Sequence, residues 1–263
     1  MNEEIRVAVH SDVGVRKKVN QDSLMLISAD TDVGILTLVS VCDGMGGLEA
    51  GEKASAAMTA ALREWFANSL AAATCLDGSM ITYERFQKEI DELVHRTADE
   101  IDSAFSMNSG TTMTAVLIGA GRYYTANVGD SRVYLFHDSV LRQLTKDQTV
   151  VQMKIDKGII TEEEALTDPE RNVLLQCVGS CDKIAPEYTE GACGAGDSFL
   201  LCSDGFRHKL TPEEIGDALK EGASAGEMRM KEILIEMTES CKARGERDNI
   251  SSVWLKLIEG SRF

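Results

Sequence analysis

Strand-sized apolar runs recur along this chain of 263 residues, and their spacing is the strongest constraint on its fold. Each run is rich in aliphatic and β-branched residues and ends in Gly, Asp, Asn or Ser, which is typical of β-strands. Only Gly-Ala-Gly separates run 111–118 from run 122–128, and only Gly-Asp-Ser separates run 122–128 from run 132–137. Connections this short predict antiparallel pairing, because parallel strands need a long crossover. The runs are IRVAVH, SLMLIS, ILTLVSVC, TTMTAVLIG, RYYTANVG, RVYLFH, SFLLCS and ISSVWLKLI.

Two pairs of amphipathic helices are expected between these runs. One pair lies between residues 49 and 107, and the other follows residue 210, where Thr211-Pro212-Glu213-Glu214 has the composition of a helix N-terminus. Two antiparallel sheets and two helix pairs predict an α+β fold, a four-layer α-β-β-α sandwich in which each helix pair covers one sheet. The apolar stripes of the first pair are Ala54, Ala57, Met58, Ala61, Leu62, Trp65 and Phe66, then Phe86, Ile90, Leu93, Val94, Thr97, Ile101 and Phe105.

Residues 145–185 differ from the rest of the chain. The stretch is charged, and Thr161 to Glu164 has the pattern of a capping box at the start of a short helix. It reads as an excursion from a single domain over residues 1–263, and two interpretations stay open. One is a plain surface insertion, and the other is a flap over an active site.

Composition limits the binding partners and the cellular compartment that are expected for this protein. The formal net charge of −16 predicts a surface that repels nucleic acid and anionic lipid, although local cations can still attract a phosphate group. Seven cysteines without a Cys-x-x-Cys pair indicate reduced thiols and a cytoplasmic protein. A metal site made by Cys177, Cys181 and Cys193 is the alternative to ordinary buried cysteines. No apolar stretch approaches the roughly 20 residues of a membrane span.

Four aspartates stand at the ends of predicted strands. Asp43 follows LTLVSVC, Asp130 follows YYTANVG, Asp204 follows SFLLCS, and Asp248 precedes NISSVWLKL. Each alone fits an ordinary turn, but packed sheets can bring distant strand ends to one edge. Carboxylates gathered there would repel one another unless cations neutralise them. Hard oxygen ligands without His or Cys select Mg²⁺ or Mn²⁺ over zinc.

A pair of such ions would suit the hydrolysis of a phosphate ester. Water bridging two cations loses a proton near neutral pH and can attack phosphorus in line, so no protein nucleophile is needed. The sequence offers none: it has no Gly-x-Ser-x-Gly and no Cys-x5-Arg loop. The four histidines, His10, His95, His137 and His208, lie outside the glycine turns and read as surface or strand residues.

Eight motifs in order carry a family resemblance from about Ser11 to Leu257. The chain resembles the bacterial protein phosphatase 2C (PP2C, PPM) family of metal-dependent Ser/Thr protein phosphatases. The resemblance implies two central antiparallel sheets flanked by helix pairs, which agrees with the layers predicted above. The motifs are SDVGVRKKVNQDS, VCDGMGGLEAGEKAS, SGTT, ANVGDSRVY, LTKDQT, RNVLLQCVGS, LLCSDG and RDNIS.

The resemblance also implies roles for individual residues. Asp43 would bridge two Mn²⁺ or Mg²⁺ ions with the Gly44 carbonyl as a further ligand, and Asp204 and Asp248 would complete the site. Asp22 would hold metal-bound waters, and Asp130 resembles the ligand of a third ion. Asn249 would orient the turn beside Asp248. The expected catalytic residues are Asp22, Asp43, Asp204 and Asp248, and the expected metal ligands are Asp43, Gly44, Asp130, Asp204 and Asp248.

One departure concerns the substrate phosphate. Family members usually carry an arginine five residues before the aspartate of the Asn-Gln-Asp motif, where this chain has Lys17, with Arg16 one residue earlier. Either Arg16 reaches the phosphate or Lys17 serves as a point charge without a bidentate grip, and solvated surface cations are the third reading. The flap motif also departs from Asp-His-Ser and reads Asp147-Gln148-Thr149.

The expected function is hydrolysis of phosphoserine and phosphothreonine in proteins, opposing a bacterial Ser/Thr kinase. The expected partners are phosphoproteins, including such a kinase, and not nucleic acid or membrane; the chain is expected to be a monomer. Two alternatives stay open: a partner-switching phosphatase for one small regulatory phosphoprotein, and a pseudophosphatase that binds phosphoproteins without turnover. Loss of a metal aspartate would indicate the latter, and none is lost.

Overall fold

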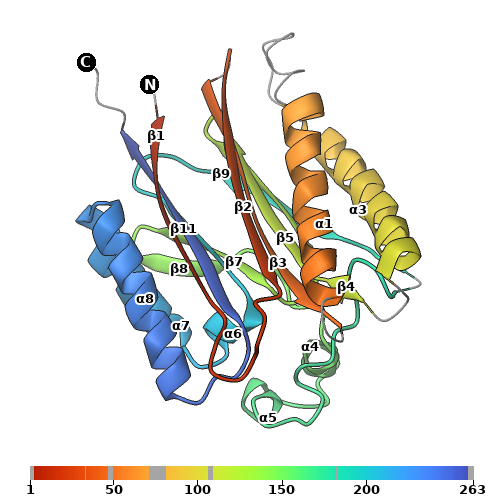
Figure 1. Cartoon of the computed structure of the whole chain (residues 1–263). Helices are drawn as coiled ribbons and strands as arrows, with labels where there is room; N and C mark the ends of the chain where they lie inside the picture. The colour runs from red at the N-terminus through yellow and green to blue at the C-terminus, as the bar shows by residue number, and fades with distance from the viewer. Residues whose placement is uncertain are drawn as a thin grey trace.

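Two antiparallel sheets lie face to face between two layers of helices in the computed structural model of this chain (Figure 1). The structure describes residues 3–32, 34–46, 50–70, 81–105, 109–181 and 183–259. The predicted four-layer α-β-β-α sandwich is therefore confirmed.

Paired strands run antiparallel throughout the described part of both sheets. The first sheet has the order β1-β11-β10-β7-β8 and the second β2-β3-β5-β6-β9, with β4 paired to the end of β3. The first sheet comprises β1 (Glu3–Asp12), β11 (Ile250–Glu259), β10 (Ser198–Cys202), β7 (Arg132–His137) and β8 (Val140–Gln143). The second comprises β2 (Asp22–Thr31), β3 (Gly34–Met45), β5 (Met113–Gly119), β6 (Arg122–Val128), β9 (Glu187–Ala192) and β4 (Gly110–Thr111).

The central strands are apolar on both faces because each face is covered. In β3, Leu36 and Leu38 pack under the helices, whereas Val39 and Val41 pack between the two sheets. Strands β10 and β11 divide their side chains in the same way, with Trp254 facing the helices on the other side of the sandwich. Alternation with a period of two explains why these strands read as continuous hydrophobic runs.

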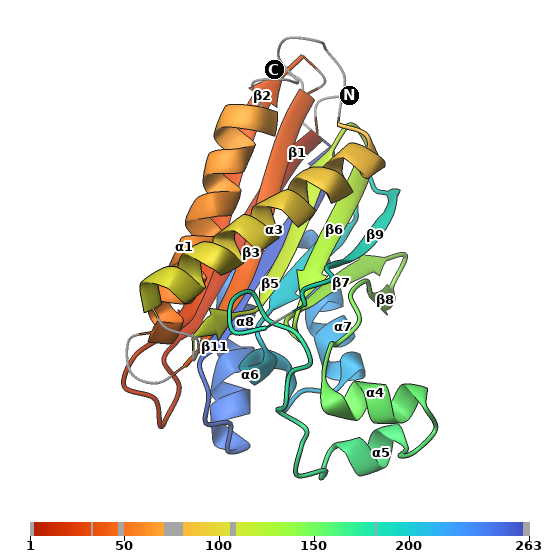
Figure 2. The ribbon, with the colours of Figure 1, turned by 90° about the vertical axis from the view of Figure 1, so that its right-hand side faces the viewer.

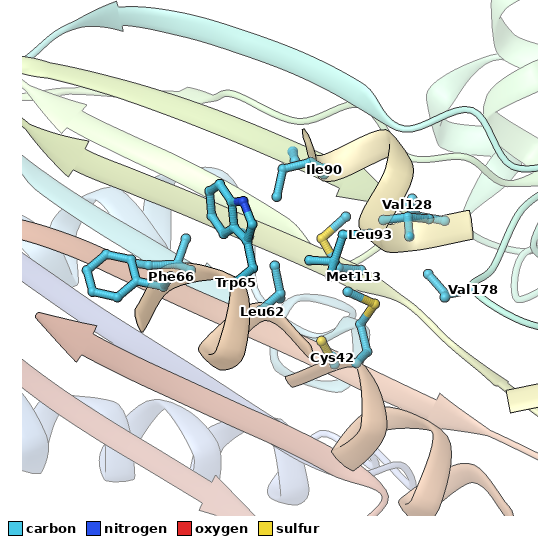
Figure 3. Close-up of a cluster of buried hydrophobic side chains, with 14 of the residues drawn as sticks. Cys42, Leu62, Trp65, Phe66, Ile90, Leu93, Met113, Val128 and Val178 are labelled. Carbon is cyan, nitrogen blue, oxygen red and sulfur yellow. The ribbon is translucent and has the colours of Figure 1, made fainter. Parts of the chain in front are cut away.

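Helices α1 (Ala50–Trp65) and α3 (Tyr83–Phe105) cover the second sheet (Figure 2). A short π-helix, Phe66–Leu70, continues α1. The predicted apolar stripes of both helices face this sheet, where Leu62, Trp65 and Ile90 pack around Met113 of β5 (Figure 3). Burial of large side chains fixes these helices on the sheet, at roughly 1.5–3 kcal/mol for each one.

Helices α7 (Pro212–Glu221) and α8 (Glu227–Ala243) cover the first sheet, joined by a 3₁₀ turn at Gly222–Ser224. The predicted start of α7 is confirmed, because Thr211 and Glu214 form a capping box and Pro212 opens the helix between them. None of the described helices is both long enough and apolar enough to cross a lipid bilayer.

The predicted pairing of run 122–128 with run 132–137 is wrong. The first run is β6 in the second sheet and the other is β7 in the first sheet, so Gly129-Asp130-Ser131 crosses between the sheets. Gly129 has a φ of +102°, a backbone conformation that lets the chain turn sharply. The short edge strands β8 and β9 were not predicted, because they lack an apolar run.

The predicted excursion leaves the sandwich after β8 and returns at β9. It carries α4 (Val150–Asp156) and α5 (Glu162–Ala165), and the predicted capping box of Thr161 and Glu164 begins α5. Both helices lie at the same end of the molecule as β4 and α6 (Asp204–Arg207), away from the labelled termini (Figure 1). Backbone bridges join Thr111 to Val178 and Thr149 to Leu174. We call residues 145–181 the flap.

Close packing of the helix layer on the sheet predicts the effect of one substitution. A Cβ added at Gly222 would lie 2.0 Å from a ring carbon of Trp254, although the φ of −76° at Gly222 suits any residue. Gly222→Ala should therefore lower the free energy of unfolding by about 1–3 kcal/mol in urea titrations. Gly194→Ala is the control, because no atom lies within 4 Å of its added Cβ. Equal losses in the two variants would contradict this packing.

Candidate functional site

The predicted aspartates meet at one end of the sandwich. Asp43 lies near the end of β3, and Asp22 begins β2 directly opposite it in the β2–β3 register. Asp204 begins α6 after β10, and Asp248 lies just before β11. The pKa of Asp43 is raised well above its usual value, first by burial and then by the charges of Asp22, Asp204, Asp130 and Asp248. The structure thus brings together all of the carboxylates that the sequence singled out.

Backbone contacts through glycine hold this end of the molecule together. A Cβ at Gly205 would lie 2.2 Å from the carbonyl oxygen of Asn249, so α6 rests directly on the start of β11. A Cβ at Gly44 would lie 2.1 Å from the carbonyl oxygen of Gly51, where α1 begins. Only glycine permits such approaches without displacement of the backbone.

Asn249 fastens the loop that precedes β2. Its side-chain oxygen accepts the buried N–H of Gln21, and its amide nitrogen donates to the carbonyls of Val13 and Val19. Asn249 therefore does orient the chain beside Asp248, and it does so by pinning the N-terminal loop against the start of β11. Loss of the side chain would leave a buried donor unpaired, at a cost of about 1–3 kcal/mol.

The electrostatics of this cluster fit divalent cations. Burial, followed by neighbouring carboxylates, raises the pKa of Asp22 to about 7 and that of Asp204 to about 6. One oxygen of each, Oδ1, is buried without a hydrogen-bond partner in the described part of the chain. Buried carboxylate oxygens are normally paired, so these two are free to ligate a hard ion such as Mn²⁺ or Mg²⁺.

Lys17 is the cation that reaches the cluster. Its Nζ lies 2.6 Å from Oδ1 of Asp248. Burial alone would lower the pKa of Lys17, but the hydrogen bond to Asp248 and the charges of Asp43 and Asp204 raise it. Arg16 is exposed and makes no ion pair with the residues that the structure describes. Of the two candidates for the substrate phosphate, the structure places only Lys17 beside the carboxylates.

Asp130 lies at the crossover between the sheets and is paired with an arginine. Nη2 of Arg207 lies 3.0 Å from Oδ2 of Asp130 and 3.1 Å from Oδ2 of Asp147. Asp147 accepts a bidentate pair of hydrogen bonds from Arg132, at 2.7 Å and 2.8 Å. Buried carboxylates and guanidinium groups thus alternate from the crossover to the base of the flap.

His208 and Glu246 also belong to this site, although the sequence did not single them out. One ligand atom from each of Asp130, Asp204 and His208 lies within 4.8 Å of the others. Nδ1 of His208 lies 3.8 Å from Oε2 of Glu246, and Oε1 of Glu246 accepts hydrogen bonds from the backbone N–H groups of Arg247 and Asp248. The interpretation of His208 as a surface or strand residue is wrong, because it lies one helical turn after Asp204. That i,i+4 spacing was the available signal.

The flap is bonded to the strand that carries Asp43. The backbone carbonyl of Asp43 accepts hydrogen bonds from the N–H of Thr112 and the hydroxyl of Thr111. Thr111 in turn exchanges two backbone hydrogen bonds with Val178 of the flap. Backbone hydrogen bonds therefore join the flap to β4, which pairs with the end of the strand that carries Asp43.

The three cysteines considered as a metal site do not gather. The sulfur atoms of Cys177 and Cys181 lie 3.2 Å apart beside β4. Cys193 bonds through its backbone to Gly121, at the opposite end of the β5–β6 hairpin. Cys75, the remaining cysteine that the cytoplasmic prediction counted, lies outside the described residues.

Comparison with known proteins places this site in context. A sequence profile for protein phosphatase 2C matches residues 14–255. The serine/threonine protein phosphatase PstP of Mycobacterium tuberculosis is 34% identical over 221 residues, which cover 82% of this chain and 39% of PstP. The serine/threonine phosphatase stp of Listeria welshimeri is also 34% identical, over 72% of this chain and 74% of its own length.

Solved structures agree with the sequence comparison. The crystal structure of Mycobacterium tuberculosis PstP superposes with a TM-score of 0.79 at 30% identity, covering 97% of this chain and 99% of that one. The catalytic domain of PstP in complex with two manganese ions gives a TM-score of 0.76 at 30% identity, over 98% of this chain and all of that one. The chain thus spans well under half of full-length PstP but nearly all of these PstP crystal structures.

The raised pKa of Asp22 predicts how pH affects the metal-free chain. A carboxyl with a pKa near 7 when folded and 3.8 when unfolded stabilises the fold below about pH 4 and loses that contribution as the pH rises through 7. In EDTA, Asp22→Asn should match the wild type in free energy of unfolding near pH 4. Near pH 8 it should be more stable, by an amount on the order of 1–3 kcal/mol.

Urea titrations across this pH range test the expectation. Asp99→Asn, on the exposed face of α3, is the control and should show no pH-dependent difference from the wild type. A difference between Asp22→Asn and the wild type that stays constant from pH 4 to pH 8 would contradict the proposed repulsion.

Proposed function

The chain belongs to the protein phosphatase 2C family, and from that premise we propose that it hydrolyses phosphoserine and phosphothreonine in proteins in a metal-dependent reaction. The observation that carries the proposal is the convergence of Asp22, Asp43, Asp204 and Asp248 on one site, with raised pKa values for the first three. A cluster of carboxylates that repel one another is a site for cations. Each aspartate of the predicted set is present, which favours an enzyme over a phosphoprotein-binding pseudophosphatase.

Asp43, Asp204, Asp248 and the carbonyl of Gly44 would hold two Mn²⁺ or Mg²⁺ ions, as PstP holds two manganese ions. Such ions supply Lewis-acid activation of water and offset negative charge on the phosphoryl group. Asp22, hydrogen-bonded to Ser203 at 3.0 Å, would orient the water molecules around them. The chain's own contribution is to fix these oxygens on rigid strand ends.

Lys17 would bind the substrate phosphate. Its ammonium group lies against Asp248 and its side chain is 40% exposed, so Lys17 can meet both the site and the solvent from which a substrate arrives. A lysine acts as a point charge and lacks the bidentate grip of a guanidinium group. Lys17 would therefore attract the phosphate without fixing its orientation.

We further infer that residues 1–263 form a single phosphatase domain, with the flap bordering its substrate cleft. Support comes from the shared apolar layer between the two sheets and from the bonds that join Thr111 to Val178. The proposed substrates are phosphoproteins, including a Ser/Thr kinase that the enzyme would oppose in the cytoplasm. Three points stay predictions: the opposing kinase, the monomeric state, and the alternative of a single small regulatory phosphoprotein as substrate. Phosphosites that accumulate in a deletion strain would distinguish one substrate from many.

Turnover with Mn²⁺ tests the catalytic proposal. The wild type should hydrolyse p-nitrophenyl phosphate and a phosphothreonine peptide only with a divalent cation. Asp43→Asn and Asp248→Asn should each lower kcat by more than about 100-fold, because each removes a proposed ligand. A folded wild-type chain that binds the phosphopeptide without turnover in Mn²⁺ or Mg²⁺ would instead support the pseudophosphatase.

The role of Lys17 predicts a separate effect on substrate affinity. Lys17→Ala should raise KM for the phosphopeptide by about 10-fold or more with a smaller change in kcat, as expected when a charge-assisted contact to the substrate is lost. Lys18→Ala, at the adjacent exposed cation, is the control. A rise in KM with Arg16→Ala but not with Lys17→Ala would transfer the role to Arg16.

A further inference from the structure

Arg207 is a charged residue at the end of a short helix, and its side chain is nonetheless largely buried. It is the last residue of α6, yet its side chain is only 11% exposed. Its Nε and Nη2 atoms donate to the backbone carbonyl of Asp130, and Nη2 also reaches the Asp130 carboxylate. Three contacts to a single residue hold the guanidinium group in place.

The side chains around Arg207 also include atoms that could ligate a cation. Ligand atoms of Asp130, Asp204 and His208 lie within 4.8 Å of one another. By donor geometry alone, this group could hold a divalent ion beyond the two proposed above. However, the guanidinium of Arg207 lies 3.0 Å from Oδ2 of Asp130, so an ion bound to this carboxylate would face a fixed positive charge.

We propose that Arg207 is the built-in counter-cation of Asp130, so that the group of Asp130, Asp204 and His208 takes no third divalent ion and the enzyme works with two. The inference rests on the proposed function, because it counts ions at the same site. It makes Arg207 a positioning residue that fixes Asp130 at the crossover between the sheets.

The balance of charge supports this assignment. Asp130 and Asp147 are offset by Arg207 and Arg132 through direct ion pairs. Asp22, Asp43, Asp204, Asp248 and Glu246 remain, and Lys17 offsets one of these five carboxylates through its pair with Asp248, so two divalent ions match the charge that is left. A third divalent ion would leave the site with an excess of positive charge before any phosphate arrives.

Asp147 gives Arg207 a second fixed partner. The carboxylate of Asp147 is clamped by Arg132 and lies three residues before α4 of the flap. Movement of Arg207 away from Asp130 would also break its pair with Asp147 inside the protein. Loss of a partner from a buried ion pair is costly, so an incoming ion would not displace the guanidinium readily.

The number of Mn²⁺ ions bound per chain tests the proposal. Equilibrium dialysis at millimolar free Mn²⁺ should give about two ions for the wild type, one at each of the two positions proposed above. Arg207→Gln keeps hydrogen-bonding capacity but removes the charge, and it should bind about one additional ion. Arg207→Lys keeps the charge and should stay at two.

Paired variants separate charge from folding. Arg207→Gln combined with Asp130→Asn should return to two ions, because the added site loses its carboxylate. Arg244→Ala, which removes a surface pair with Glu214, is the control and should bind two. Circular dichroism establishes that each variant is folded. A purely structural role for Arg207 would reduce stability without adding a metal site.

Two results would overturn the proposal. One is a folded Arg207→Gln chain that still binds two ions. The other needs no variant of Arg207: three ions in the wild type and two in Asp130→Asn would show that Asp130 binds metal beside the arginine. Fewer than two ions in the wild type is a different result, since it would refute the proposed two-metal site itself.

Discussion

Repulsion between carboxylates shapes the active end of this molecule. Asp22, Asp43 and Asp204 are buried close enough together to raise the pKa of each. Side chains that repel cannot hold one another in place, so the backbone must do so. Pairing of β2 with β3 and the contact of Gly205 with Asn249 provide that rigidity. The fold thus stores an unfavourable arrangement of charge that bound cations would relieve.

Strand register links this arrangement to the core. Asp22 faces Asp43 because β2 and β3 pair residue by residue from Thr31 and Gly34 onward. A slip by one residue would turn Leu36 and Leu38 away from the helices, and the buried apolar area would then be lost. Packing far from the site therefore decides which carboxylates meet in it. Metal binding and core stability are coupled through the same strands.

Much of the fold and of the candidate site could be predicted from the sequence, and the features that were not predicted were missed for physical reasons. Strand runs and apolar stripes predicted the layers, because burial on both faces leaves a clear pattern. The aspartates at strand ends predicted the cluster, since sheets gather their ends. The crossing at Gly129 was missed because a short connection can turn within one sheet or pass to another. Arg207 was missed because only the fold brings its side chain to Asp130, and His208 was missed because its i,i+4 spacing from Asp204 matters only once a helix is expected there.

Two kinds of counter-charge serve one continuous group of carboxylates. At the crossover and the flap base, Arg207 and Arg132 belong to the chain and stay with it. Around Asp22, Asp43 and Asp248 the chain supplies Lys17, and the rest of the positive charge must come from solution. The two arginines keep Asp130 and Asp147 in place whether or not metal is bound, because these ion pairs do not depend on metal. Exchange of metal would then change the charge around Asp43, while these ion pairs hold the chain at Asp130 and Asp147 in place.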